Sequence, residues 1–321
     1  MFDVAHLRRV VAARGAVARV VIAGHDGSSP RETGTAMLVW ADGQDGTIGG
    51  GALEHEAALR ARAMLAEGAA ARLDRRALGP NLGQCCGGAV TLLTEVYDAD
   101  AVARLDGAVI ARAVAPGAGP DMPLAVSRLV ARARGEGVLP VATLVQGWMV
   151  EPVARATRDL WVWGAGHVGR ALVAVMAPLP GLSITWVDVD RARFPDAVPD
   201  GVTLRIAAAP ETLIAEAQPG AEHLILTFSH ALDLALCHGL LAHGFARAGL
   251  IGSATKWARF RSRLAALGHG AADIARIDCP IGDPSLGKHP QAIAVGVASA
   301  FLRQGLAQAG LSGSASRGTA G

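Results

Sequence analysis

In the first half of the chain, the spacing of hydrophobic residues predicts both helices and strands, but these elements do not follow one another in regular alternation. Apolar residues three or four positions apart predict helices, and short apolar runs bounded by turn residues predict strands. On this basis the predicted helices are residues 2–14, 52–67 and 123–134, and the predicted strands are residues 18–23, 35–40 and 138–145. This pattern predicts an α+β domain.

From residue 160 onwards, predicted strands and helices follow one another in turn. The predicted strands are residues 160–163, 184–187, 202–206, 223–228 and 248–251, and the predicted helices are residues 171–175, 210–218, 234–243 and 292–302. Such alternation is typical of a parallel sheet with helices on both faces. The sequence therefore predicts an α/β protein in which a Rossmann-like, doubly wound domain follows the α+β domain.

The boundary between the two domains is predicted at a polar connector. Residues 1–150 form the predicted first domain, residues 151–159 the linker, and residues 160–305 the Rossmann-like domain. The remaining segment, 306–321, is rich in alanine, glycine and serine, and we expect it to be disordered.

Composition narrows the class of protein. The 321 residues are 51% hydrophobic and 18% charged, which indicates a globular chain long enough for two cores. A formal net charge of +2 gives no reason to expect a nucleic-acid partner. No apolar run of about 18 residues predicts a membrane span, and the N-terminal residues do not resemble a signal peptide. We therefore expect a cytoplasmic protein with reduced cysteines.

Two adjacent cysteines stand within glycines, in the segment Gly83-Gln84-Cys85-Cys86-Gly87-Gly88. Glycine allows the backbone to approach a ligand closely, and thiolates bind soft metals. A zinc site would need two further ligands at the usual spacing, which the neighbouring sequence lacks. A disulfide between adjacent cysteines would be strained. The pair is either a soft ligand site or two small residues buried at the start of a strand.

Two further glycine-rich turns each precede a predicted helix. Gly49, Gly50 and Gly51 lead into the helix at 52–67, where free N–H groups suit an anion. A tight turn explains the same glycines, and Glu54 in the first helical turn suits the helix dipole. The second turn, Gly164-Ala165-Gly166-His167-Val168-Gly169, lies between a predicted strand and helix, as in dinucleotide-binding domains.

Acidic and histidine residues follow two strands of the second domain. Asp188 ends the next predicted strand after the Gly164–Gly169 turn, where such folds place the carboxylate that binds a ribose. His230 and Asp233 follow the strand at 223–228, at an edge where open α/β sheets bind ligands. They serve either as polar or acid–base contacts or as structural groups. No Ser-His-Asp order or H-E-x-x-H motif indicates a hydrolytic site.

Taken together, the motifs of both halves resemble bacterial xanthine dehydrogenase accessory proteins of the XdhC/CoxI type, over residues 2–302. The segments that carry the resemblance are 27–31, 48–54, 83–88, 163–169, 227–233, 249–256, 280–282 and 287–288. Phe228 departs from the pattern, since relatives usually carry histidine there. The resemblance implies a chaperone for molybdenum cofactor rather than a metabolic enzyme. Such a protein binds the molybdopterin form, protects it during sulfuration and delivers it to apo-xanthine dehydrogenase.

The resemblance also implies roles for residues. We expect Cys85 and Cys86 at the molybdenum, with Gly83, Gln84 and Gly87 beside them. Residues expected to shape the pocket are Gly49, Gly50, Gly51, Ser29 and Arg31, and those expected at a phosphate or nucleotide are Gly164, Gly166, Gly169, Asp188 and His230. The implied partners are apo-xanthine dehydrogenase, a cysteine desulfurase and a protein that donates the cofactor or transfers a nucleotide. We expect a homodimer, and no membrane partner.

Two other readings of the sequence remain open. The Gly164–Gly169 turn with Asp188 fits an NAD(P)-dependent oxidoreductase, which would bind a nicotinamide nucleotide and turn over a small substrate. A redox-sensing thiol protein would instead use Cys85 and Cys86 as an oxidisable pair. The oxidoreductase reading leaves the two cysteines without a function.

Overall fold

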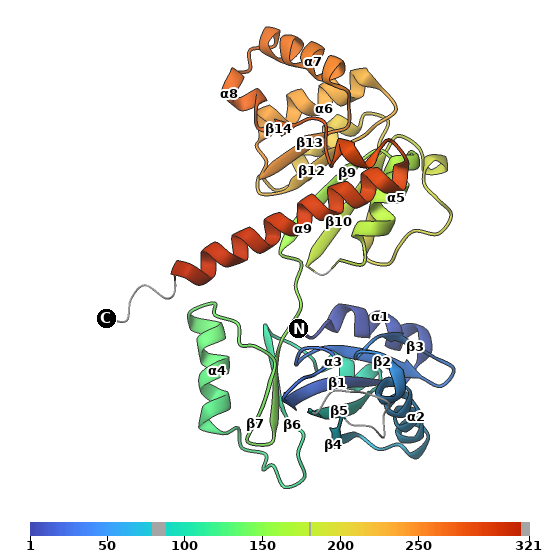
Figure 1. Cartoon of the computed structure of the whole chain (residues 1–321), viewed down its shortest axis with the longest axis vertical. Coiled ribbons are helices and arrows are strands. Elements are labelled where there is room, and N and C mark those ends of the chain that lie inside the picture. The colour runs from blue at the N-terminus through green and yellow to red at the C-terminus, as the bar shows by residue number, and fades with distance from the viewer. Residues whose placement is uncertain (79–87, 180, 316–321) are drawn as a thin grey trace. The chain divides into compact units, whose positions relative to one another are not determined.

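The computed structural model describes residues 1–78, 88–179 and 181–315, with side chains up to residue 303 (Figure 1). The chain forms two compact units, Met1–Arg155 and Ala156–Gly321. The division falls within the predicted linker 151–159, but that linker is too long at both ends. Strand β8 (Trp148–Pro152) belongs to the first unit, and strand β9 (Arg158–Trp163) begins the second.

The first unit is built on a five-stranded antiparallel sheet in the order β3-β2-β1-β5-β4. Its strands are β1 (Val17–Asp26), β2 (Ala36–Trp40), β3 (Gly43–Gly46), β4 (Ala71–Ala77) and β5 (Ala89–Tyr97). The central strand β1 alternates between two buried faces. Ala18, Val20 and Ile22 pack with helix α2 (Gly51–Glu67), and Val21 and Ala23 pack with the opposite layer.

That opposite layer is a three-stranded antiparallel sheet, in the order β6-β8-β7. It comprises β6 (Val109–Ala113), β7 (Thr143–Val145) and β8, and helix α4 (Leu124–Gly135) packs on it. The predicted strand at 138–145 is wrong in its first five residues, which form no strand and include Val141, 85% exposed. Pro140 explains this, because proline cannot donate a ladder hydrogen bond. Helices α1 (Val4–Arg14) and α3 (Ala99–Ala103) complete the unit.

The second unit contains a six-stranded parallel sheet in the order β11-β10-β9-β12-β13-β14. The remaining strands are β10 (Leu182–Asp188), β11 (Val202–Ile206), β12 (Glu222–Ile225), β13 (Arg247–Leu250) and β14 (Ile277–Asp278). In this order β9, the first strand of the unit, lies in the middle of the sheet. Strands β10 and β11 follow on one side of it and β12, β13 and β14 on the other, so the strand order switches sides between β9 and β12, as in a Rossmann fold. The predicted doubly wound fold is therefore confirmed.

Helices cover both faces of this sheet. Helices α5 (His167–Met176) and α9 (Pro290–Ala315) pack on one face. The other face contacts α6 (His230–His243), α7 (Ala254–Ala266), α8 (Ala271–Ile274) and a 3-10 helix, Pro210–Glu216. No helix in the part of the chain that the structure describes has both the length and the hydrophobicity to cross a membrane.

The final helix extends further than the sequence pattern predicts. The predicted helix ends at residue 302, whereas α9 continues to Ala315; the disorder expected for residues 306–321 stays a prediction. Leucine, alanine and glutamine between residues 302 and 309 are good helix formers, and no proline interrupts them. Residues 316–321 lie outside the described residues.

Candidate functional site

The carboxyl edge of the parallel sheet carries the glycine turn between β9 and α5. A Cβ on Gly164 would lie 2.4 Å from the carbonyl oxygen of Leu226, and one on Gly169 would lie 2.1 Å from the carbonyl oxygen of Gly164. These two glycines allow close packing of strand, turn and helix. Gly166 differs, because a Cβ there would meet no atom within 4 Å. The backbone at Gly166 is thus open to a ligand at the N-terminus of α5.

Replacing Gly169 with alanine is expected to lower the free energy of unfolding by about 1–3 kcal/mol, because its methyl group would overlap a backbone carbonyl. The matched control is Gly166→Ala, whose φ of −72° is normal for alanine; this change should cost less than about 1 kcal/mol. Urea denaturation of both variants measures the difference. Equal stability of the two variants would contradict the packing role of Gly169.

Asp188 ends β10 beside this turn, but its carboxylate is already engaged. One oxygen, Oδ2, accepts a hydrogen bond from the Ala165 N–H at 2.6 Å. The other, Oδ1, accepts from the Val189 N–H at 2.7 Å and lies 2.8 Å from Nε of Arg193. Asp188 is buried. It therefore links the glycine turn to β10, and its side chain, 2% exposed, leaves little of the carboxylate accessible to a ribose.

Arg193 and Phe228 form a second feature of the same edge. The guanidinium of Arg193 lies 4.1 Å from the centre of the Phe228 ring, a cation–π arrangement. The Phe228 side chain is 61% exposed although it is large and apolar. The edge thus presents a cation and an aromatic ring close to the open backbone of Gly166, a combination suited to a planar anionic ligand.

Asp233 and Lys256 form a buried ion pair beyond β12. Nζ of Lys256 lies 2.6 Å from Oδ2 of Asp233 and 2.9 Å from the carbonyl oxygen of Ile251. The other carboxylate oxygen of Asp233 accepts from the hydroxyl of Thr227 at 2.7 Å. This network joins the loops after β12 and β13. His230, the first residue of α6, is exposed, and the structure leaves it available at this edge.

In the first unit, three predicted segments converge at one end of the five-stranded sheet. A Cβ on Gly49 would lie 2.6 Å from Cβ of Pro30, so the triple-glycine turn packs directly on the loop that contains Ser29 and Arg31. The hydroxyl of Ser29 donates to the carbonyl oxygen of Arg31 at 2.7 Å. Gly88 packs on the same loop, because a Cβ there would lie 2.2 Å from the carbonyl oxygen of Ser28.

In the triple-glycine turn, the N–H of Gly50 faces the chain's own carboxylate. Oε2 of Glu54 accepts from the N–H groups of Ile48 and Gly50, each at 3.0 Å, and from the hydroxyl of Thr47 at 2.5 Å. Partial burial would raise the pKa of Glu54, but these hydrogen bonds outweigh it and hold the pKa below its usual value. An external anion at Gly50 would therefore compete with Glu54.

The cysteine pair lies outside the described residues, as do Gly83, Gln84 and Gly87. The other two cysteines are in the second unit. Cys237 is completely buried, and burial raises the pKa of its thiol to about 12. Burial also raises the pKa of Cys279. Across the described residues, no group of three or more histidine, cysteine or acidic side chains could hold a metal ion.

Some residues of these sites escaped sequence reasoning. Arg193 ends a short 3-10 helix, Arg191–Arg193, that follows Asp188, and no periodic pattern in the sequence marks it as a partner of the carboxylate. The pairing of Asp233 with Lys256 joins residues of two different helices, and only the fold brings them together. The departure from the expected histidine at Phe228 was the one signal that could have drawn attention to the edge near Arg193.

Two family models match the chain. The model described as the XdhC and CoxI family matches residues 10–75, and the model described as the XdhC Rossmann domain matches residues 160–300. Together they include the triple-glycine turn of the first unit and all six strands of the second. Among proteins with curated functions, none matches the chain.

Solved structures share the fold. A structure titled as a xanthine dehydrogenase from Bacillus halodurans is 18% identical and superposes with a TM-score of 0.65, over 94% of this chain and 95% of that chain. The tRNA N6-threonylcarbamoyladenosine dehydratase TcdA from E. coli is 14% identical, with a TM-score of 0.35, over 48% of this chain and 88% of that chain. The first match shows that the fold of both units occurs together elsewhere.

Proposed function

Because this chain belongs to the XdhC and CoxI family, we propose that it is an accessory protein that binds molybdenum cofactor for the maturation of xanthine dehydrogenase. In this role it is not itself an enzyme. It holds the molybdopterin form of the cofactor, protects it while the terminal sulfido ligand is installed, and passes it to apo-xanthine dehydrogenase. A cysteine desulfurase supplies the sulfur, a cofactor-donating or nucleotide-transferring protein acts upstream, and the accessory protein works as a homodimer.

The observation that carries this proposal is the convergence in the first unit. The triple-glycine turn and Gly88 both pack on the loop 28–31, so three segments of the family pattern meet at one place. Gly88 also ends the segment that contains Cys85 and Cys86. The proposal assigns the molybdenum to these two thiols, since soft sulfur ligands suit an oxidisable metal centre. Ser29, Arg31 and the glycines supply the surrounding backbone and polar groups.

A phosphate or nucleotide site is assigned to the second unit. Gly166 has open space at the N-terminus of α5, and Arg193 supplies a positive charge near it. Gly50 suits a phosphate less well, because its N–H donates to Glu54. This favours the Gly164–Gly169 turn for a phosphate or nucleotide. The engaged carboxylate of Asp188 argues against the ribose contact that a nicotinamide enzyme would make there.

Retention of the cofactor tests the proposal. The anaerobic protein is incubated with released molybdenum cofactor and desalted, and its molybdenum and pterin contents are measured. We expect near-stoichiometric retention, and a loss of at least about tenfold in affinity for Cys85→Ala, since even residues outside the first ligand shell contribute that much to a metal site. Cys237→Ala, which removes a thiol from the second unit, is the matched control and should retain the cofactor.

Two outcomes would contradict the proposal. If the wild-type protein retains no molybdenum and no pterin but binds a nicotinamide nucleotide, the oxidoreductase reading replaces it. If Cys85→Ala and Cys237→Ala retain the cofactor equally, the thiols of the glycine-enclosed segment are not at the molybdenum.

A further inference from the structure

A row of charged residues lies on one face of the parallel sheet, where such sheets are normally apolar. Side chains alternate along a strand, so Leu160, Leu224 and Gly249 share the face that packs on α9. By the same alternation and register, Glu222 and Arg247 stand opposite each other on β12 and β13, and Asp278 stands beside Gly249. Three charged residues therefore occupy the face beneath α9.

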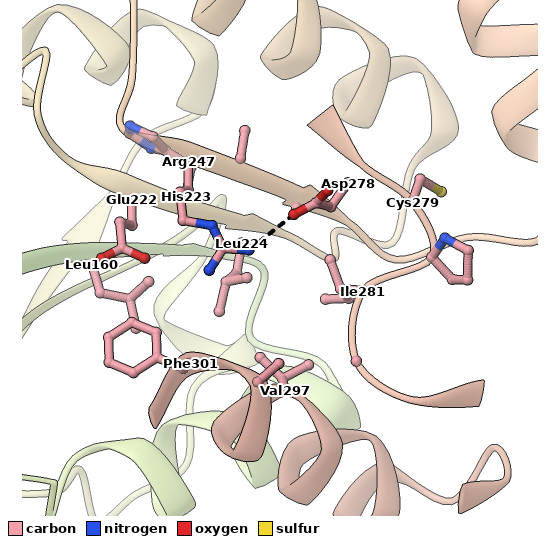
Figure 2. Close-up of a pocket in the computed structure, with 15 residues that line it drawn as sticks. Leu160, Glu222, His223, Leu224, Arg247, Asp278, Cys279, Ile281, Val297 and Phe301 are labelled. Atoms are coloured by element: carbon pink, nitrogen blue, oxygen red, sulfur yellow. Dashed lines mark hydrogen bonds and ion pairs between the residues drawn. The ribbon is translucent and has the colours of Figure 1, made fainter. Parts of the chain in front are cut away.

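These residues line a cavity of about 310 Å³ between the sheet and α9. Figure 2 shows Val297 and Phe301 pointing from α9 toward the sheet, and Ile281 closing one side. The volume is at the lower end of the range of small-molecule sites, which suits a compact ligand. No residue of the Gly164–Gly169 turn lines this cavity, so it is separate from the edge described above.

One end of the cavity is rigid. Arg158 forms a double hydrogen bond with Glu222, at 2.5 and 2.7 Å, which satisfies both carboxylate oxygens. The same guanidinium donates to the carbonyl oxygen of Phe301 at 3.0 Å and lies over its ring. The apolar wall formed by Phe301 is thus held by a partly buried charge pair.

The other end of the cavity presents polar groups that can form further hydrogen bonds. Nη2 of Arg247 donates to Oδ2 of Asp278 at 2.9 Å, which is the one side-chain hydrogen bond that this guanidinium makes among the described residues. A guanidinium has five N–H donors, and a carboxylate accepts several hydrogen bonds. The pair is partly exposed, so it contributes little to stability and can rearrange around a ligand.

We propose that this cavity binds a compact bicyclic heterocycle with a lactam edge, in which an N–H donor stands beside a carbonyl acceptor. The lactam carbonyl accepts from Arg247, and the adjacent N–H donates to Asp278. The ring system lies against Leu224 and Ile281 on one side and Val297 and Phe301 on the other. Purines and pterins share this chemistry, and the cavity is a site for one of them in addition to the proposed cofactor site.

Titrations with two free heterocycles test the proposal on the full-length protein. Xanthine represents the purines and is titrated by calorimetry; pterin represents the pterins and is followed by its fluorescence. We expect saturable binding of at least one of them, and a loss of at least about tenfold in affinity for Arg247→Gln, which removes a charged hydrogen bond. Ala300→Leu, which fills the cavity from α9, should weaken binding similarly. Arg263→Gln, at an exposed arginine of α7, is the control.

Binding of xanthine alone or of pterin alone identifies the natural class, and binding of both supports the shared lactam edge. The proposal is overturned if the wild-type protein binds neither probe up to its solubility limit. It is equally overturned if a probe binds but Arg247→Gln and Ala300→Leu, both shown to be folded by their melting temperature, bind as tightly as Arg263→Gln. Because Cys85 takes no part, these results are independent of the molybdenum retention experiment.

Discussion

Replacing Glu151 with glutamine is expected to lower the free energy of unfolding of the first unit by about 3–5 kcal/mol. Glu151 is completely buried and lies between Arg19, at 2.7 Å, and Arg112, at 2.7 Å. Burial alone would raise the pKa of Glu151, but the two guanidinium groups outweigh it and hold the pKa below its usual value. Without the carboxylate charge, Arg19, itself 2% exposed, would remain buried without a counter-ion.

The location of this network makes the effect measurable. Arg19 belongs to β1 of the five-stranded sheet and Glu151 to β8 of the three-stranded sheet, so the pair joins the two layers of the unit. Hydrogen–deuterium exchange with peptide resolution should show faster exchange in β1 and β8 and unchanged exchange in β9 and β10. The control is Glu136→Gln, which removes an exposed partner of Arg132 and should cost less than about 1 kcal/mol. Unchanged protection of β1 and β8 in Glu151→Gln would disprove the prediction.

The second unit could be predicted well because its signals are local and mutually consistent. Gly164, Gly166 and Gly169 mark the turn between strand and helix; a side chain at Gly164 or Gly169 would collide with backbone, whereas Gly166 borders open space. The buried strands that follow are apolar runs of ordinary length. The sequence could not show that Asp188 accepts a hydrogen bond from the N–H of Ala165, because a carboxylate at this position can accept equally from a ribose hydroxyl or from a backbone N–H.

The first unit was harder to predict, and its hairpin shows why. Strands β7 and β8 are joined by Gln146 and Gly147, with φ of 50° and 80°, as a two-residue hairpin turn requires. Glycine at the second position was a usable signal, but glutamine rarely adopts a positive φ, so the turn was missed. The predicted linker therefore includes residues 151 and 152 of β8, and with them the buried Glu151.

The two glycine-rich turns look alike in sequence but differ in the structure. At the first, the N–H of Gly50 is satisfied by Glu54, only four residues away, so the tight-turn interpretation of the sequence explains the geometry. At the second, the space beside Gly166 contains no atom of the chain within 4 Å of a Cβ position. Spacing alone does not separate these cases, because a carboxylate binds each turn and the difference lies in which N–H it occupies: that of Gly50 in the first turn and that of Ala165 in the second.

His223 makes the stability of the second unit depend on pH. His223 belongs to β12, and its ring stacks on the indole of Trp163 in the neighbouring strand β9, with ring centres 6.0 Å apart. Nε1 of Trp163 donates to Nδ1 of His223 at 3.2 Å, so the proton of the neutral ring is assigned to Nε2. Burial, with a smaller contribution from the nearby His243, lowers the pKa of His223 from 6.5 to about 3. The folded protein therefore holds this histidine neutral.

In the unfolded chain, His223 takes up a proton as the pH falls below 6.5, whereas in the folded chain it does so only near pH 3. The unfolded state thus binds more protons in this window, and the free energy of unfolding decreases as the pH falls. The full effect is about 5 kcal/mol, at about 1.4 kcal/mol for each unit of pKa. Between pH 7.5 and pH 5.0 we expect His223 to contribute a loss of about 2 kcal/mol.

Urea denaturation at these two pH values, with the wild-type protein and His223→Gln, measures this contribution. Glutamine does not titrate, and its amide oxygen can accept from the indole of Trp163, so the variant should lose about 2 kcal/mol less than the wild type on acidification. His230→Gln, at an exposed histidine of the same unit, should keep the wild-type dependence. Restricting the comparison to pH 5.0 and above keeps most carboxylates ionised, so the difference between the variants reports one imidazole. Equal losses in the wild type and His223→Gln would show that His223 does not stay neutral in the folded core.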